Sequence, residues 1–407
     1  MKEIAGGVCA PKGFLAGGIR CGIKESSRKK DLALIYSHKF CTAAAVFTTN
    51  RVKAASVRVS QENVADGQLR AIIVNSGNAN ACTGQAGMDA ARRMAHLAAD
   101  AFLISPSEVA VASTGVIGVP LPIDVIEKNI DTLKASLRDD EQGHADALEA
   151  IMTTDTRKKE IAVEIEIAGK PVHIGAMVKG SGMIHPNMAT MLAFITTDAG
   201  VLPSALDSSL RLAVKRSFNR LTVDGDTSTN DMVLIMANGE AGNAPITEGS
   251  ADYEIFSSAL EYVCTALTRK MARDGEGATK LVTVTVTGAS CEEKAEALAK
   301  SVASSSLVKA ACFGADANWG RVLCAMGYAG VEFEPEKVNV SFSSTAGQIE
   351  VCRNGGSVSF SEEKAKLILS EEEIEILIDI QEGDSKASVW GCDLTYDYVK
   401  INGDYRS

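Results

Sequence analysis

The sequence contains 407 residues, of which 46% are hydrophobic and 23% are charged, as in globular proteins. Its formal net charge of −11 argues against nucleic acid or an anionic membrane surface as a partner, because either would require clustered lysine and arginine. Ten scattered cysteines without a C-x-x-C pair fit neither a zinc site nor a small disulfide framework, so reduced thiols are expected. The first residues lack a sustained apolar run, and no run approaches the ~18 residues that span a bilayer, so a cytoplasmic protein is predicted.

The first quarter of the chain predicts strands followed by a helix. Gly-rich turns at 6–7 and 17–18 precede strands at 32–36, 42–47 and 69–74, and a helix follows at 88–102. Residues 75–80, between the last of these strands and the helix, form a polar loop, and the sequence has no G-x-x-x-x-G-K-[ST] pattern of a P-loop. This loop has two possible interpretations. It is either an asparagine-rich turn that satisfies its own backbone hydrogen bonds or one wall of a substrate site.

The next predicted strand, 109–112, ends in Ser113-Thr114-Gly115. A backbone N–H exposed at a glycine beside a hydroxyl can stabilise an oxyanion, although many strand ends have this composition. A helix is predicted at 123–137, followed by a charged turn at 138–142.

Residues 153–156, Thr-Thr-Asp-Thr, place three hydroxyls and a carboxylate in four positions. This pattern suits recognition of a charged amino acid, and it is also common at strand ends. A hairpin at 161–167 and 172–177 then leads to Lys179, the cation of the loop that follows.

The segment after Lys179 changes character near its middle. Glycine and proline interrupt it up to Asn187, whereas residues 190–196 form a short, nearly continuous apolar run that predicts a buried strand. Thr190 stands at this junction, where a buried hydroxyl without a partner would cost about 1–3 kcal/mol. If Thr190 attacked the carbonyl of Ala189 and the ester hydrolysed, its free α-amine, of pKa about 8, could serve as base for its own hydroxyl. An ordinary threonine at the start of a strand is the alternative interpretation.

The second half of the chain predicts helices and strands around several loops. Helices are predicted at 204–218, 253–271 and 292–307, and strands at 232–236, 280–286, 338–342 and 376–380. The acidic loop 222–231 lacks the ligand spacing of an EF-hand and is interpreted as a hydrogen-bonded loop that flanks the site. Glu276, between two glycines, is either a surface residue or a positioned polar group. The loop 313–321, with Asp316, Asn318 and Arg321, contacts substrate or joins the lobes, and both interpretations remain open.

Several segments, in this order along the chain, resemble landmarks of the ornithine acetyltransferase family, the glutamate N-acetyltransferases of the cyclic arginine pathway. The clearest is Lys179-Gly-Ser-Gly-Met-Ile followed by Pro186-Asn-Met-Ala-Thr-Met-Leu192, which resembles the family's self-cleavage motif. The others are Ala112-Ser-Thr-Gly115, Met152-Thr-Thr-Asp-Thr156, Arg273-Asp-Gly-Glu-Gly-Ala278 and Ile401-Asn-Gly-Asp-Tyr-Arg-Ser407. The resemblance therefore covers nearly the whole chain.

The resemblance implies cleavage between Ala189 and Thr190, which divides the protein into an α chain, 1–189, and a β chain, 190–407. Thr190 is then the nucleophile, with the hydroxyl of Thr114 and the N–H of Gly115 as the oxyanion hole. The residues that the resemblance assigns to substrate binding are Thr153, Lys179, Thr190, Glu276, Asn402 and Ser407, with Thr154 as an alternative to Thr153. His185 is interpreted as a bystander, because the family does not fix a histidine at this position.

By resemblance, the fold is α/β, with two lobes of layered mixed sheets and covering helices, similar to N-terminal-nucleophile enzymes. The implied reaction transfers the acetyl group of N2-acetylornithine to L-glutamate through an acetyl-threonine intermediate, without a metal or organic cofactor. The chains are expected to associate as an α2β2 heterotetramer, and the sequence does not decide whether acetyl-CoA is a second donor. The rival interpretations are an N-terminal-threonine amidohydrolase or aminopeptidase, which would not require glutamate, and a non-catalytic binding module, which would remain uncut.

Overall fold

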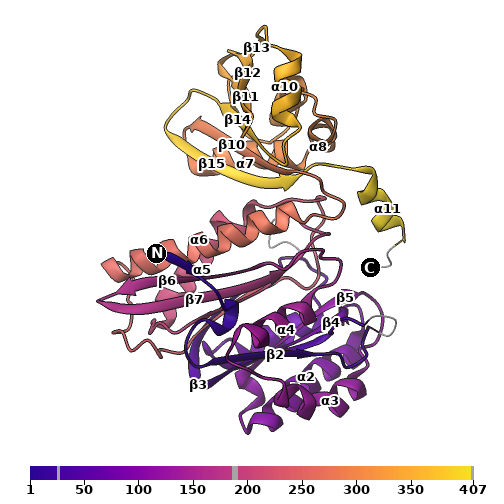
Figure 1. The fold of residues 1–407 in the computed structure, drawn as a ribbon, viewed down its shortest axis with the longest axis vertical. Coiled ribbons are helices and arrows are strands. Elements are labelled where there is room, and N and C mark those ends of the chain that lie inside the picture. The colour runs from indigo at the N-terminus through magenta and orange to yellow at the C-terminus, as the bar shows by residue number, and fades with distance from the viewer. Residues whose placement is uncertain (25–27, 186–190, 405–407) are drawn as a thin grey trace.

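The computed structural model describes residues 1–24, 28–185 and 191–404, which form two lobes (Figure 1). The described part of the first lobe contains a nine-stranded mixed sheet in which the order is β1-β6-β7-β8-β9-β3-β4-β5, with β2 paired to β3. Its strands are β1 (Lys2–Ile4), β2 (Phe14–Ile19), β3 (Leu32–Phe47), β4 (Gln68–Asn78), β5 (Val109–Val116), β6 (Glu160–Ile167), β7 (Lys170–Lys179), β8 (Leu192–Thr197) and β9 (Met232–Ala237). Strands β8 and β9 thus lie between strands that precede them in the sequence.

Strand β3 links the two ends of this sheet. Its first part pairs with β2 and β4, its last part pairs with β9, and the register with β4 shifts between Tyr36 and Cys41. One buried apolar core consequently combines side chains of β3, β4 and β5 with those of β7, β8 and β9 and of helix α4.

Six helices belong to the described part of the first lobe. They are α1 (Ala55–Asn63), α2 (Gly84–Phe102), α3 (Ile123–Ala135), α4 (Glu141–Ile151), α5 (Pro203–Arg216) and α6 (Ala251–Arg273). Helices α1, α2 and α3 share a core with β3, β4 and β5, whereas α5 and α6 share one with β6 to β9. Short 3-10 helices occur at Gly7–Cys9, Pro106–Glu108, Phe218–Arg220 and Pro335–Lys337.

The second lobe is built on a six-stranded sheet of order β13-β12-β11-β14-β10-β15. Its elements are β10 (Leu281–Ala289), α7 (Glu292–Ser304), α8 (Ser306–Phe313), α9 (Trp319–Gly327), β11 (Asn339–Ser344), β12 (Gly347–Arg353), β13 (Gly356–Ser357), α10 (Glu362–Leu369), β14 (Glu373–Asp379) and β15 (Ser385–Cys392). The chain then leaves this lobe, and α11 (Tyr396–Asp404) returns toward the first lobe (Figure 1). No helix in the described ranges is both long enough and apolar enough to cross a membrane.

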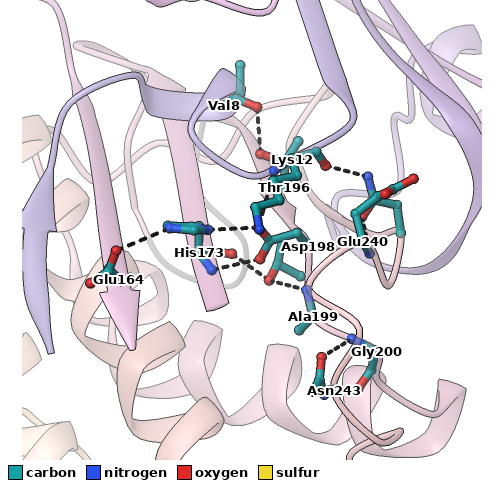
Figure 2. A network of polar contacts seen from close by, with 12 residues as sticks. Val8, Lys12, Glu164, His173, Thr196, Asp198, Ala199, Gly200, Glu240 and Asn243 are labelled. Carbon is teal, nitrogen blue, oxygen red and sulfur yellow. Dashed lines mark hydrogen bonds and ion pairs between the residues drawn. The ribbon is translucent and has the colours of Figure 1, made fainter. Parts of the chain in front are cut away.

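A polar network fixes the N-terminal segment to the end of β8 (Figure 2). The buried carboxylate of Asp198 accepts hydrogen bonds from the backbone N–H groups of His173 (2.7 Å) and Lys12 (3.2 Å), and it contacts the His173 ring at 2.7 Å. The hydroxyl of Thr196 donates to the carbonyl oxygen of Val8 (2.8 Å). These contacts satisfy buried polar groups where the strand ends, which stabilises the sheet on which the site is built.

The structure confirms the predicted mixed α/β class with two lobes and corrects several element boundaries. The two strands predicted at 32–36 and 42–47 are one strand, β3, with an irregularity between them. Gly17 and Gly18 lie inside β2 rather than in a turn, because α4 packs closely there: a Cβ at Gly18 would lie 2.2 Å from the carbonyl oxygen of Asp146. The helix predicted at 292–307 is two helices, since Ser305 caps the second one by accepting the Val308 N–H.

Five helices, α1, α4, α9, α10 and α11, were not predicted. The charged segment interpreted as a turn at 138–142 contains the start of α4, whose N-cap is Asp140. The boundary between the lobes falls near residue 280. The predicted division at 189/190 separates two chains rather than two lobes, and it stays a prediction.

Candidate active site

A small cavity lies where the ends of β5 and β7 meet the loop before β9, the end of α6 and the C-terminal helix. The space open to the centres of water molecules is about 90 Å³. Its lining residues are Ala79, Thr114, Gly115, Ile117, Thr153, Thr154, Lys179, Gly182, Met183, Ser228, Thr229, Asn230, Glu276 and Asn402. The cavity therefore brings together residues from segments that are far apart in the sequence.

Thr114 and Gly115 form one wall of the cavity at the end of β5. Gly115 has a φ of 134°, and a Cβ there would lie 2.3 Å from the carbonyl carbon of Gly77 on the paired strand β4. Only glycine fits this close approach of two backbones. The local sequence thus ends the strand with a hydroxyl and a glycine, both at the cavity wall.

Lys179, the last residue of β7, is buried beside this strand end. Its Nζ donates to Oγ1 of Thr114 at 3.2 Å. Burial lowers the pKa of Lys179 below its ordinary value, and the nearby carboxylate of Asp155 partly opposes that shift. A buried ammonium is costly unless anions or hydrogen-bond acceptors compensate it, so the cavity favours an anionic group beside Lys179.

A buried ion cluster holds two walls of the cavity together. The ammonium of Lys159 lies 2.6 Å from Oδ1 of Asp155 and 2.5 Å from Oδ2 of Asp274. Burial alone would raise the pKa of Asp155, but the ammonium groups of Lys159 and Lys179 outweigh it and hold that pKa below its usual range. Asp155 also accepts the N–H groups of Thr153 (3.0 Å) and Gly180 (2.7 Å), so the cluster fixes the segments on both sides.

Glu276 lies opposite the strand end, on the turn after α6. Its N–H donates to the carbonyl oxygen of Ser181 (3.0 Å), and its carboxylate accepts from Nδ2 of Asn402 on α11 (2.9 Å). A Cβ at Gly182 would lie 2.3 Å from Oε2 of Glu276, so this glycine makes room for the carboxylate. The C-terminal helix is thereby linked to the cavity through a side-chain hydrogen bond.

Two polar residues before β9 were not singled out from the sequence. Nδ2 of Asn230 donates to the carbonyl oxygens of Ala79 and Ser113, each at 2.7 Å, which joins the loop before β9 to two other segments of the cavity wall. The fully buried Asp231 accepts the N–H of Met191 at 2.9 Å, and burial raises its pKa well above the ordinary value. An acidic residue directly before an apolar strand is the signal that could have indicated it.

The predicted site residues fall into two groups. Thr114, Gly115, Thr153, Lys179, Glu276 and Asn402 all line the cavity, as does the alternative Thr154. Ala189, Thr190 and Ser407 lie outside the described residues.

Other side chains considered in the sequence lie away from the cavity wall. His185 contacts the hydroxyl of Thr222 at 3.1 Å and is not a lining residue. Asn318 caps α9, and Arg321 donates to the carbonyl oxygen of Leu307, so this loop serves the second lobe. The loop 75–80 satisfies part of its own backbone, since Asn75 donates to the carbonyl of Asn78, and also contributes Ala79 to the cavity.

Acyl transfer on a small zwitterion uses groups of the kind that surround this cavity. They are a hydroxyl and an N–H at a strand end, a buried ammonium and a carboxylate. The model of the ArgJ family matches residues 15–407, and the chain belongs to that family.

Individual relatives cover the chain from end to end. The arginine biosynthesis bifunctional protein ArgJ of Symbiobacterium thermophilum is 54% identical over 408 residues, covering 100% of both chains. The glutamate N-acetyltransferase of Methanothermobacter thermautotrophicus is 49% identical over 410 residues, covering 100% of this chain and 98% of the relative. The crystal structure of arginine biosynthesis bifunctional protein ArgJ from Bacillus halodurans is 45% identical with a TM-score of 0.50, covering 52% of this chain and 98% of the solved chain.

Proposed function

We propose that this protein transfers the acetyl group of N2-acetylornithine to L-glutamate, which yields ornithine and N-acetylglutamate for arginine biosynthesis. Membership of the ArgJ family and relatives of about 50% identity along the full length support this assignment. The observation that carries it is that a single cavity gathers all six described positions at which the resemblance implies function. Those positions are Thr114, Gly115, Thr153, Lys179, Glu276 and Asn402.

In the first half-reaction, the hydroxyl of Thr190 attacks the acetyl carbonyl while its own α-amine takes the hydroxyl proton. The amide bond then breaks, the leaving amine of ornithine receives that proton, and an acetyl-threonine ester remains. Met191 follows Thr190 in the sequence, and its N–H is held by buried Asp231. This hydrogen bond fixes the backbone directly beside the proposed nucleophile.

The contact between Lys179 and Thr114 explains how a threonine can serve an oxyanion hole. An ammonium group only donates, so the Thr114 oxygen accepts from Lys179 and its own hydrogen remains free to donate elsewhere. The positive charge also makes this hydroxyl a better donor. Together with the N–H of Gly115, it can stabilise the negative charge that develops on the acetyl oxygen.

In the second half-reaction, the α-amine of glutamate attacks the ester carbonyl and the bond from that carbon to the Thr190 oxygen breaks. A proton from the attacking amine passes through the Thr190 α-amine to the Thr190 oxygen, which restores the hydroxyl, and N-acetylglutamate leaves. Both amino acids use one cavity, which therefore has to recognise groups that they share. Lys179 keeps donor capacity for an α-carboxylate after its bond to Thr114. Glu276, held by Asn402, is placed for an amine, and Thr153 and Ser407 supply further hydroxyls.

The same proposal includes autocleavage between Ala189 and Thr190. The cut would fall between β7 and β8, which are hydrogen-bonded neighbours, and β8–β9 would remain between two strands of the other product. The products would stay associated, because separation would expose buried strands on both sides. The solved Bacillus halodurans chain matches only 52% of this chain over 98% of its own length, a size compatible with one half of a divided protein.

The remaining parts of the proposal follow from the family. Two αβ units associate as α2β2, the enzyme works in the cytoplasm, and neither metal nor organic cofactor takes part. The ten cysteines, all of them described, are free thiols, which suits a reducing compartment. Acetyl-CoA acts as a second acetyl donor, in line with the word bifunctional in the relatives' names.

Intact-mass measurement of the denatured protein tests the proposal. Two fragments that divide between Ala189 and Thr190, with the C-terminal one gaining an acetyl group on exposure to N2-acetylornithine without glutamate, are expected. Addition of glutamate should remove the acetyl group and form N-acetylglutamate. The variant Thr190→Ala is the matched control and should remain uncut and unacetylated. A wild-type chain that is uncut and never gains mass would refute the assignment.

A further inference from the structure

The strand that carries the proposed oxyanion hole lies at an edge of its sheet. In the described part of the first lobe, β5 is the last strand after β4, so the backbone groups on its other side have no neighbouring strand there. The pairing with β4 also becomes irregular at Gly77 and Asn78, which lie opposite Thr114 and Gly115. Regular sheet pairing thus holds this strand end on one side only, and the backbone groups of the free edge need other partners.

Side chains from outside the sheet bond the free edge of β5 at every second residue. These hydrogen bonds, each of 2.7 Å, join Asn63 to the carbonyl of Val109, Ser60 to both backbone groups of Val111, and Asn230 to the carbonyl of Ser113. The backbone groups of a strand alternate between its two sides, which predicts that the N–H of Gly115, two residues after Ser113, faces the same edge. Of these three side chains, Asn230 therefore bonds β5 nearest to the proposed oxyanion hole.

The side-chain amide of Asn230 uses both of its hydrogens within the protein. Its Nδ2 donates to the carbonyl oxygens of Ser113 and Ala79, each at 2.7 Å. Its Oδ1 accepts the hydroxyl hydrogen of Thr229 at 2.5 Å. A primary amide has two hydrogens to donate, so none remains for a substrate oxygen. Although Asn230 lines the cavity, it can stabilise an oxyanion only through the strand end that it holds.

The residue after Asn230 makes a matching contact to the start of β8. The carboxylate of Asp231 accepts the N–H of Met191 at 2.9 Å, and the carbonyl of Met191 accepts the N–H of Met232 at 3.1 Å. Two consecutive residues, Asn230 and Asp231, therefore link the end of β5 to the backbone from which β8 begins. Because a planar peptide bond joins them and their Cα atoms are about 3.8 Å apart, this link is short and stiff.

We propose that Asn230 is a positioning residue for acetyl transfer, which holds the end of β5 so that the Thr114 hydroxyl and the Gly115 N–H meet the charge that develops on the acetyl oxygen. The inference rests on the proposed function, because it gives Asn230 a part in that reaction. Without the amide, the carbonyl of Ser113 loses its partner and the strand end is free to shift. A shift of about 1 Å in a reacting geometry can lower a rate by about 100-fold.

The kinetics of Asn230→Ala and Asn230→Leu test this role, since alanine removes the amide and leucine keeps much of its volume without a donor. Asn243→Ala is the matched control. Nδ2 of Asn243 also donates to two carbonyls, those of Gly200 (3.1 Å) and Ala244 (2.8 Å), but this residue lies past the opposite end of β8 and does not line the cavity (Figure 2). Rates are expressed per cleaved chain, as counted by intact mass, so slower autocleavage does not enter the comparison.

Both Asn230 variants should lower kcat by at least about 30-fold. Their KM values should change by less than about threefold, because Asn402 holds Glu276 independently of Asn230. Asn243→Ala should keep kcat within about twofold of wild type, even where it lowers the melting temperature as much. Near-normal kcat in a cleaved Asn230 variant would overturn the inference, as would an equal loss of kcat in the control or a rise in KM alone. Absence of acetyl transfer in the wild type would refute the proposed function itself, whereas an active wild type with unaffected Asn230 variants would refute this inference alone.

Discussion

Replacement of Lys159 by methionine is the sharpest test of how the site is held together. Its ammonium lies 2.6 Å from Asp155 and 2.5 Å from Asp274, and all three side chains are at least 98% buried. Methionine keeps much of the length but leaves two buried carboxylates without their shared cation. A carboxyl of ordinary pKa about 3.9 can avoid the buried charge by binding a proton, which at pH 7 costs about 4 kcal/mol. Lys159→Met should therefore lower the free energy of unfolding by about 3–5 kcal/mol.

The pH dependence of this loss has a definite sign. In the wild type the pKa of Asp155 is held low, so its ionisation does not change between pH 5 and 7. In the variant, a buried carboxyl with a raised pKa keeps a proton that the unfolded chain has released, so stability falls as pH rises. The difference between the two proteins should widen by about 1.4 kcal/mol per pH unit for each extra proton.

Urea unfolding followed by circular dichroism at pH 5, 6 and 7 measures both effects. Lys158→Met is the control, because the neighbouring residue is exposed and forms no ion pair in the described part of the chain, and it should change stability by less than about 0.5 kcal/mol. A loss below about 1 kcal/mol for Lys159→Met at pH 7, or a loss independent of pH, would show that the cluster does not hold the carboxylates as argued.

Three further outcomes concern catalysis. Gly115→Ala should lower kcat by at least about 100-fold, because a Cβ would displace the N–H at the strand end; near-normal kcat in a folded variant would contradict an oxyanion role. Asn402→Ala should raise KM for both substrates by about tenfold while the circular dichroism spectrum stays unchanged, since it removes the hydrogen bond that holds Glu276, and an unaltered KM would separate α11 from substrate binding. His185→Gln should leave the pH profile of kcat/KM unchanged, because His185 does not line the cavity, and a shifted profile would make it a participant.

The strands next to the site could be predicted because all of their side chains are buried. Residues 192–197 and 232–237 are buried throughout, so burial on both faces produced the continuous apolar runs from which strands were predicted. Contacts between residues that are far apart in the chain left a weaker signal in the sequence. That Asp274 shares a cation with Asp155 depends on two loops meeting in space, and neither loop has a composition that distinguishes a buried ion pair from a solvated turn.

The C-terminal segment shows most clearly that a local sequence pattern does not reveal long-range contacts. By its local pattern it should fray, yet Tyr396–Asp404 forms α11, tied at its start by Thr395, which donates to the carbonyl of Gly277. Gly277 has a φ of 70°, and a Cβ there would lie 2.6 Å from the N atom of Tyr398, so α11 can approach only because this position is glycine. The contact that brings the helix to the cavity joins Asn402 to a residue 126 positions earlier, and no local pattern encodes such a separation. The resemblance of the whole chain to a family could place Asn402 in the site, because a family retains the fold in which the two segments meet.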